Sequence, residues 1–163
     1  MRVTITTQLN CPPGRAWQEV QTSRLLRYVT APLVAFKPVE PPSFPEVWRE
    51  EKYLVGMWLF GLLPVGRQWI VIGIVTADST QGSQRYQLRD NGHGDVISTW
   101  DHWITIEEAA DGTTLYTDDV EVKAGVLTPF VWAYANTFYR YRQVRWPQLV
   151  KRKFTYNEPT KAT

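Results

Sequence analysis

The sequence predicts an α+β protein in which a curved antiparallel sheet of about six to seven strands wraps around a long C-terminal helix. Five segments within residues 52–123 are predicted to form strands, the last two with alternating apolar and polar residues, and short stretches rich in Gly, Asp, Asn and Pro separate them. After Thr128 an aromatic-rich segment has helical spacing and is too apolar to stand alone. A sheet that grips such a helix implies an interior space.

The N-terminal part of the chain predicts one strand and two short helices after it. Arg2–Leu9 alternates apolar and polar residues, and the Pro-Pro-Gly run at residues 12–14 ends this strand. From Arg15 onward, apolar residues recur at helical spacing in two groups. Thr22 or Ser23, which lies between the groups, can cap the second helix.

The middle of the chain predicts an irregular crossover followed by a meander. Residues 32–45 carry five of the eleven prolines, so they cannot hold a continuous ladder or helix. The strands expected after this crossover cover residues 52–60, 67–77, 83–89, 96–108 and 113–123.

The last helix is expected over Thr128–Lys151. Pro147 should kink this helix, because its missing N–H leaves the carbonyl of Gln143 without a partner. A chain of 163 residues fits one domain, which we place at residues 1–154, with a flexible tail at residues 155–163.

Composition argues against several classes of protein. The net charge of +2 is too small to indicate a nucleic-acid-binding protein. Cys11 is the one cysteine, so no internal disulfide can form. The longest apolar run, residues 53–63, has about half the length needed to cross a bilayer, so stable membrane insertion is not expected. Residues 1–7 lack the pattern of a secretion signal, and a cytoplasmic, bacterial-type protein is the expectation.

Two polar residues interrupt apolar faces of the last two strands. Even positions share one face of each strand, and those on this face are Val96, Trp100, Ile104 and Ile106 on one strand and Tyr116, Val120 and Val122 on the next. His102 and Asp118 lie among them and should therefore point inward. A three-residue turn at 109–111 would place His102 directly opposite Asp118, within side-chain contact.

This pair has two interpretations. It can be a satisfied polar pair that sets strand register, because buried polar groups need partners in any case. Alternatively, the Asp118 carboxylate orients the imidazole of His102 to bind a ligand or move a proton. A serine triad is less well supported, since Ser98 lies about 13 Å away along the strand. We expect no metal site, because the other histidine, His93, falls in a Gly-rich turn at residues 91–94.

The last helix presents an aromatic stripe with one cation in it. At helical spacing the stripe comprises Phe130, Tyr134, Phe138, Tyr141, Arg145 and Leu149. Arg145 can extend past the helix end to water. Alternatively Arg145, or Arg142 nearby, faces the cavity and pairs with Asp118 or with a ligand carboxylate or phenolate. The remaining basic residues near the C-terminus are typical of a solvated helix face.

Three short motifs carry a resemblance to a known superfamily. They are W-x-H at residues 100–102, G-T-x-x-x-x-D-x-V at residues 112–120 and F-Y-R-Y-R at residues 138–142. With the order of elements, they make the chain resemble the START-like, or Bet v 1-like (SRPBCC), helix-grip superfamily and its small bacterial polyketide cyclase/dehydrase-like proteins. The resemblance implies a deep cavity between sheet and C-terminal helix, which such proteins have adapted to lipids, hormones and aromatic polyketides.

Two functions follow as hypotheses, and neither calls for a cofactor. The first is non-catalytic binding of a hydrophobic, aromatic or acyl, small molecule. Its expected wall residues are Trp100, Tyr134, Phe138 and Tyr141, and its expected polar anchors are His102, Asp118, Arg142 and Arg145. The second is a cyclase, dehydratase or hydrolase in which His102, oriented by Asp118, is the general acid or base. Binding is favoured because the sequence shows no nucleophile and no set of oxyanion donors.

A third, weaker hypothesis is an interaction module that uses the outside of the sheet. Both faces of the hairpin at residues 52–77 are apolar, and we place Leu54 with Ile70 on one face and Tyr53 with Trp69 on the other. Only one face can line the cavity, so the other needs a cover. The crossover at residues 32–45 or a second copy of the chain could supply it, and the width of the patch favours a homodimer.

Overall fold

The computed structural model describes residues 1–75 and 85–156. Its elements are β1 (Arg2–Leu9), α1 (Pro13–Val20), α2 (Ser23–Thr30), β2 (Val34–Glu40), β3 (Lys52–Leu59), β4 (Leu63–Val75), β5 (Arg85–Gly94), β6 (Thr99–Glu108), β7 (Thr114–Lys123) and α3 (Thr128–Lys151). The two short helices and the long last helix therefore form where the sequence predicts them, and Thr22 caps α2 by accepting the N–H of Leu25.

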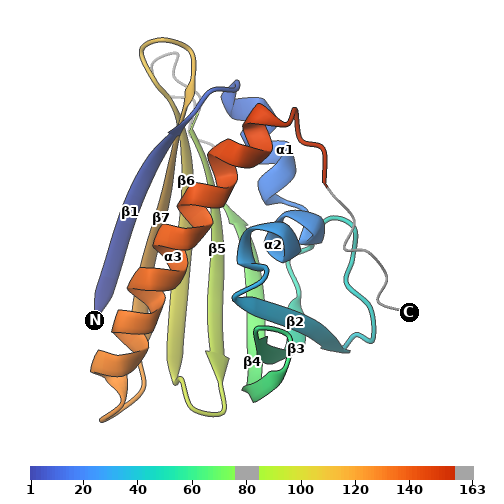
Figure 1. Cartoon of the computed structure of the whole chain (residues 1–163), viewed down its shortest axis with the longest axis vertical. Coiled ribbons are helices and arrows are strands. Elements are labelled where there is room, and N and C mark those ends of the chain that lie inside the picture. The colour runs from blue at the N-terminus through green and yellow to red at the C-terminus, as the bar shows by residue number, and fades with distance from the viewer. Residues whose placement is uncertain (76–84, 157–163) are drawn as a thin grey trace.

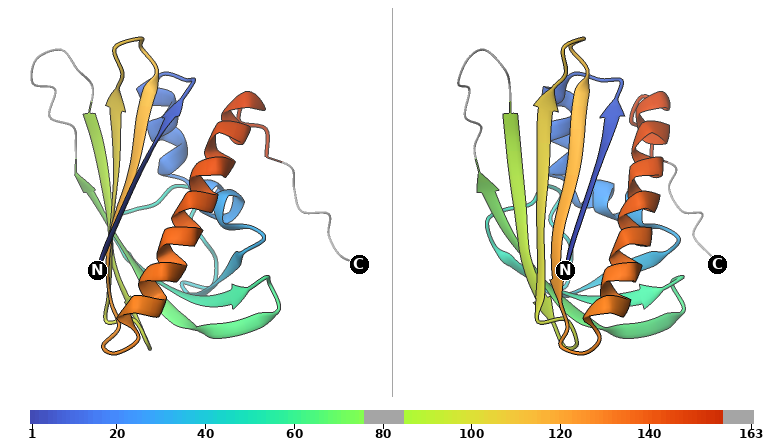
Figure 2. Two further views of the ribbon diagram at one scale, coloured as in Figure 1. Left: turned by 60° about the vertical axis from the view of Figure 1, so that its left-hand side comes forward. Right: turned by 90° about the vertical axis from the view of Figure 1, so that its left-hand side faces the viewer.

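The seven strands form one antiparallel sheet in the order β1-β7-β6-β5-β4-β3-β2. The chain passes from the β1 edge to the β2 edge through α1 and α2, and α3 then lies across the same face of the sheet (Figure 1). Figure 2 shows the sheet curving around these helices. This is the α+β helix-grip architecture that the sequence predicts.

The proline-rich crossover corrects one expectation. Part of it is the strand β2, in which Pro38 pairs with Val55 of β3, and the register shifts between Pro38 and Glu40. A proline cannot donate to a ladder, but β2 is an edge strand with a neighbour on one side only. The prolines therefore permit an edge strand where we expected irregular structure.

Strands β6 and β7 bury alternate residues, as the sequence predicts. Two details before the start of β6 differ from the sequence prediction. Val96 lies outside β6 and is 55% exposed, and residues 91–94, expected as a turn with His93, belong to β5. The ends predicted at residues 76–77 and 83–84 lie outside the described residues.

The hairpin β3–β4 corrects the expected division into faces. Tyr53 pairs with Ile70 and Leu54 with Trp69, so odd positions of β3 share a face with even positions of β4. Tyr53 and Ile70 lie in the core, whereas Leu54 and Trp69 are half-buried on the outer face. Trp48, which follows the crossover, packs on Tyr53 with ring centroids 5.0 Å apart, so it covers the inner face. The homodimer through the outer face stays a prediction.

The helix α3 runs without a break through Pro147, and its buried face is rotated from the predicted stripe. Its buried residues are Ala135, Phe138, Tyr139, Arg142, Gln143, Trp146 and Leu149. Phe130 is 75% exposed. The rotation arises because α2 packs beside α3 and takes part of the expected stripe: the Tyr141 hydroxyl donates to the carbonyl of Ala31, and Arg145 lies over the ring of Tyr28.

At the C-terminal end, Tyr156 packs edge-on against Tyr28 and its hydroxyl donates to Glu19. The rest of the expected tail, residues 157–163, lies outside the described residues. Among the helices of residues 1–75 and 85–156, α3 included, none combines the length and apolarity needed to cross a membrane.

Candidate functional site

A polar layer crosses the interior between two apolar clusters. It consists of His102 on β6, Asp118 on β7 and Arg142 on α3, all nearly or fully buried. One cluster includes Ile104, Tyr116 and Trp146, and the other includes Trp100, Val120 and Tyr139. Each polar residue therefore sits between apolar neighbours on its own element. Burying such groups is costly unless they are paired, so their partners decide what the layer can do.

The predicted contact between His102 and Asp118 is confirmed, although the register of β6 against β7 differs from the predicted one. Nε2 of His102 lies 2.7 Å from Oδ1 of Asp118. His102 pairs across the ladder with Val120, and Ile104 pairs with Asp118, because the turn spans residues 109–113 and is longer than expected. The two side chains are diagonal neighbours, which long side chains can bridge.

Asp118 is the centre of this layer. Its Oδ1 also accepts the Tyr116 hydroxyl at 2.9 Å, its Oδ2 accepts Gln143 Nε2 at 3.1 Å, and Arg142 Nη2 lies 3.7 Å from Oδ1. Burial by itself raises the pKa of Asp118, but the positive charge of Arg142 and the bond to His102 outweigh it, so the pKa lies below its usual range. Asp118 is therefore ionised at neutral pH.

His102 is neutral at the same pH. Burial lowers its pKa more than the bond to the Asp118 carboxylate raises it. A neutral imidazole next to an ionised carboxylate donates its Nε2 hydrogen to it. Nδ1 of His102 then carries the lone pair, and in the described part of the chain no group donates a hydrogen bond to it. This nitrogen can accept a proton or a hydrogen bond from a ligand.

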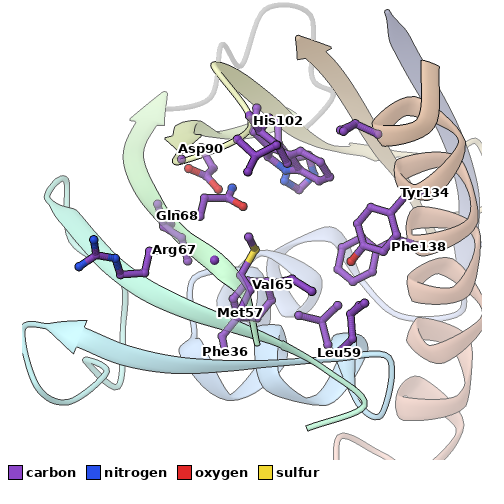
Figure 3. A pocket seen from close by; sticks show the side chains of 18 of the residues that line it. Phe36, Met57, Leu59, Val65, Arg67, Gln68, Asp90, His102, Tyr134 and Phe138 are labelled. Carbon is purple, nitrogen blue, oxygen red and sulfur yellow. The ribbon is translucent and has the colours of Figure 1, made fainter. Parts of the chain in front are cut away.

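A cavity of about 280 Å³ adjoins the polar layer, between α3 and the part of the sheet that runs from β2 to β6. Figure 3 shows Met57, Phe36 and Leu59 on the side of β2 and β3, with Tyr134 and Phe138 of α3 across from them. Five lining residues are also exposed, namely Val65, Arg67, Asp95, Val96 and Tyr134, so the mouth lies between β4, the β5–β6 loop and α3.

The structure brings together most of the site residues predicted from sequence. Those that line the cavity are Trp100, His102, Tyr134, Phe138 and Arg142. Asp118 does not line the cavity itself, but it contacts His102, which does. Tyr141 and Arg145 do not line the cavity, because they hold α2 against α3. Of the two arginines considered for a cavity role, the structure places Arg142 there.

Sequence reasoning missed four polar residues of the cavity wall, namely the exposed Arg67 and Asp95 and two inward ones, Gln68 and Asp90. Each of the two inward residues interrupts an inward apolar alternation: Gln68 precedes Ile70 and Ile72 on β4, and Asp90 follows Leu88 on β5. This is the same signal that identified Asp118. For Asp90 the signal was missed because the predicted third strand of the meander ended at residue 89. Gln68 lay within the predicted strand at residues 67–77, where both faces are apolar and the inward face was not distinguished.

Asp90 faces His102 directly across the β5–β6 ladder, so the histidine has one carboxyl on each side. Oδ1 of Asp90 accepts the N–H of Val71 at 2.8 Å, where the β4–β5 ladder is interrupted. Burial raises the pKa of Asp90 to about 7, against smaller opposing effects of that hydrogen bond and of Arg142. Asp90 is thus partly protonated at neutral pH, whereas Asp118 is ionised.

Within residues 1–75 and 85–156, no cluster of three His, Cys, Asp or Glu side chains is arranged to hold a metal ion. The described arrangement can therefore offer apolar walls, a neutral imidazole, a carboxyl that titrates near neutrality and one buried arginine. These groups can bind an amphipathic molecule, and they can also move a proton.

Known proteins resemble this chain in structure and not detectably in sequence. No family model matches it, and no curated protein matches its sequence.

Among solved structures, a protein from Thermus thermophilus has a TM-score of 0.61 at 9% identity, over 95% of this chain and 100% of the other. A START superfamily protein from Mycobacterium smegmatis has a TM-score of 0.59 at 14% identity, over 93% and 98% of the two chains. The Zhui aromatase/cyclase from Streptomyces sp. R1128 has a TM-score of 0.56 at 10% identity, over 95% and 96%. At these identities the likeness shows the shared helix-grip fold and no more.

Proposed function

We propose that the protein binds a hydrophobic small molecule in the cavity between α3 and the sheet. The observation that carries the proposal is the cavity itself, whose walls are largely apolar and aromatic and whose polar groups gather near His102. Ligand sites commonly have this composition. The fold supports the same reading, since the helix-grip fold of START and Bet v 1 proteins is typical of hydrophobic ligand binding.

The cavity volume limits the size of the ligand. A cavity of about 150 Å³ lined by apolar side chains holds one benzene ring. This cavity has about 280 Å³, roughly twice as much. It therefore suits a ligand with one or two aromatic rings, or an acyl chain of similar volume, and a larger ligand would have to extend through the mouth at Val65 and Val96.

Naphthalene binding tests the proposal. We expect naphthalene to bind the wild-type protein in isothermal titration calorimetry, and Leu59→Trp to weaken binding at least about tenfold, because the larger side chain fills the cavity that Leu59 lines. Leu54→Trp is the matched control, since Leu54 is also half-buried on β3 but faces outward. Equal losses in both variants, or no binding to wild type, would contradict the proposal.

A second candidate function is a cyclase or dehydratase reaction with His102 as general acid or base. The contact of 2.7 Å between Nε2 of His102 and Asp118 favours it, together with Asp90, the ladder partner of His102 on β5. Asp118 would orient the ring, and Nδ1 would take a proton from a carbon next to a ligand carbonyl.

Turnover of a poly-β-ketone analogue tests this candidate. His102→Asn should lower the rate by about 10² to 10⁴, the range typical of a lost general base. His93→Asn is the control, because His93 is exposed on the outer face of β5 and should leave the rate unchanged. If wild type binds naphthalene but shows no turnover that depends on His102, the protein is a binding protein.

A further inference from the structure

Three polar groups of the cavity wall have no hydrogen-bonding partner among the described residues. Gln68 as a whole residue is 6% exposed, and its side-chain amide makes no hydrogen bond there. Asp90 uses Oδ1 for the N–H of Val71, which leaves Oδ2 without a partner in the same part of the chain. Nε of Arg142 is buried and likewise unpaired. Polar groups that lose water when a ligand fills the cavity need a new partner, so a cavity wall that carries these unpaired groups points to a ligand that pairs them.

Gln68 and Asp90 form one continuous polar wall. They come from neighbouring strands and converge above Gly92: a Cβ atom built there would lie 3.1 Å from Nε2 of Gln68 and 3.2 Å from Oδ1 of Asp90. Figure 3 shows the two side chains next to each other, with His102 beside them and the apolar walls farther away. The absence of a side chain at Gly92 leaves room for this arrangement.

The charges around this wall disfavour an ionic head group. The charge of Arg142 is already balanced by Asp118, whose Oδ1 lies 3.7 Å from Nη2. A ligand carboxylate would meet Asp90 and Asp118 in addition to Arg142. A ligand ammonium would be placed near the buried guanidinium. A neutral group avoids both repulsions and needs no desolvation of a charge.

We propose that the wall formed by Gln68 and Asp90 binds the hydroxyl group of a neutral aromatic alcohol or phenol. This rests on the function proposed above and names its ligand class. A hydroxyl has one hydrogen to donate and two lone pairs. It donates to Oδ2 of Asp90 and accepts from Nε2 of Gln68, while its ring lies between the apolar walls of β3 and α3. An analogue without the hydroxyl leaves both groups unpaired, which is the basis of strong discrimination.

Three probes of similar size test this ligand class. Naphthol, methylnaphthalene and naphthoate, substituted at the same ring position, differ only in the head group. At about pH 8 naphthol stays largely neutral, as expected for a phenol, naphthoate is ionised, and Asp90 is mostly ionised, so that its Oδ2 can accept the hydroxyl hydrogen. We expect naphthol to bind at least about tenfold more tightly than either of the others, with the affinities measured by isothermal titration calorimetry.

The variant Gln68→Met removes the amide and keeps the side-chain length. We expect it to reduce the preference for naphthol over methylnaphthalene to less than about threefold. Gln87→Met is the control, because Gln87 lies on β5 and bonds to Thr105, away from the cavity lining, and it should keep the full preference. Urea unfolding checks that both variants fold.

The outcomes separate this inference from the function on which it rests. Equal binding of naphthol and methylnaphthalene to wild type overturns the hydroxyl subsite and leaves hydrophobic binding intact. Tightest binding of naphthoate also overturns it, and identifies Arg142 as an anion anchor. A full naphthol preference in Gln68→Met removes Gln68 from the subsite. If none of the three probes binds, the function proposed above fails as well.

Discussion

Replacing Asp118 with asparagine is expected to lower the free energy of unfolding by about 3 to 5 kcal/mol, the range typical of breaking a buried ion pair from one side. Asp118 is fully buried, and four side chains depend on it: His102, Tyr116, Arg142 and Gln143. Asparagine keeps the size of the side chain but leaves the guanidinium of Arg142 without a counter-charge. Urea unfolding followed by tryptophan fluorescence measures the loss, since the chain has eight tryptophans.

Asp119→Asn is the matched control for this variant. Asp119 is the next residue of β7 and faces outward, where it pairs with the exposed Arg2. Surface ion pairs contribute little, so we expect a loss below about 1 kcal/mol. Adding Arg142→Met to Asp118→Asn should recover part of the stability, because it removes the uncompensated charge. Similar losses for Asp118→Asn and Asp119→Asn would show that the polar layer stabilises the fold no more than a surface ion pair does.

Replacing Asp90 with asparagine is expected to stabilise the protein above neutral pH by about 4 kcal/mol, since the rise of the Asp90 pKa to about 7 corresponds to that free energy, and to change little near pH 4. Burial raises the pKa of Asp90 in the folded protein to about 7, from a usual value of 3.8. Asparagine has similar size, can still accept the N–H of Val71 and never carries a charge. It therefore removes the cost of an ionised carboxylate in the cavity wall.

The direction in which the free energy of unfolding changes with pH follows from proton binding to Asp90. Between the usual pKa and about 7, folded Asp90 holds a proton that the unfolded chain has released. The stability contributed by this group is thus complete below that window and is lost as the pH rises through it. The other charged groups that act on Asp90 are Arg142 of α3, which lowers its pKa, and Asp101 of β6, which raises it slightly. Both are present in wild type and variant.

The measurement is the difference between the unfolding free energies of Asp90→Asn and wild type, taken at several pH values from about 4 to 8. Taking the difference largely cancels the titration of His102, whose lowered pKa affects wild type and variant alike. Gln87→Met is the control, because Gln87 has no ionisable group and lies away from the cavity lining, so its difference should not vary with pH. A flat difference for Asp90→Asn would mean that Asp90 is solvated like a surface carboxylate.

The sequence by itself determined which residues of β6 and β7 point inward. Alternation along a strand is a local property, so the apolar neighbours of His102 and Asp118 were enough to predict that both are buried on one face. The order of the other elements was equally readable, since the turns and the N-cap Thr22 depend on neighbouring residues in the chain, whereas the edge strand β2 was hidden by its prolines.

The tertiary structure alone decided how those elements meet. The register of β6 and β7 depends on the length of the turn at residues 109–113, and a change of two residues turned an opposite pair into a diagonal one. The rotation of α3, which selects Arg142 over Arg145 for the cavity, is set by the packing of α2 against it. Gln68 and Asp90 form one wall because β4 and β5 are neighbours in the sheet. Contacts of this kind join residues far apart in the chain, and no local pattern encodes their alignment.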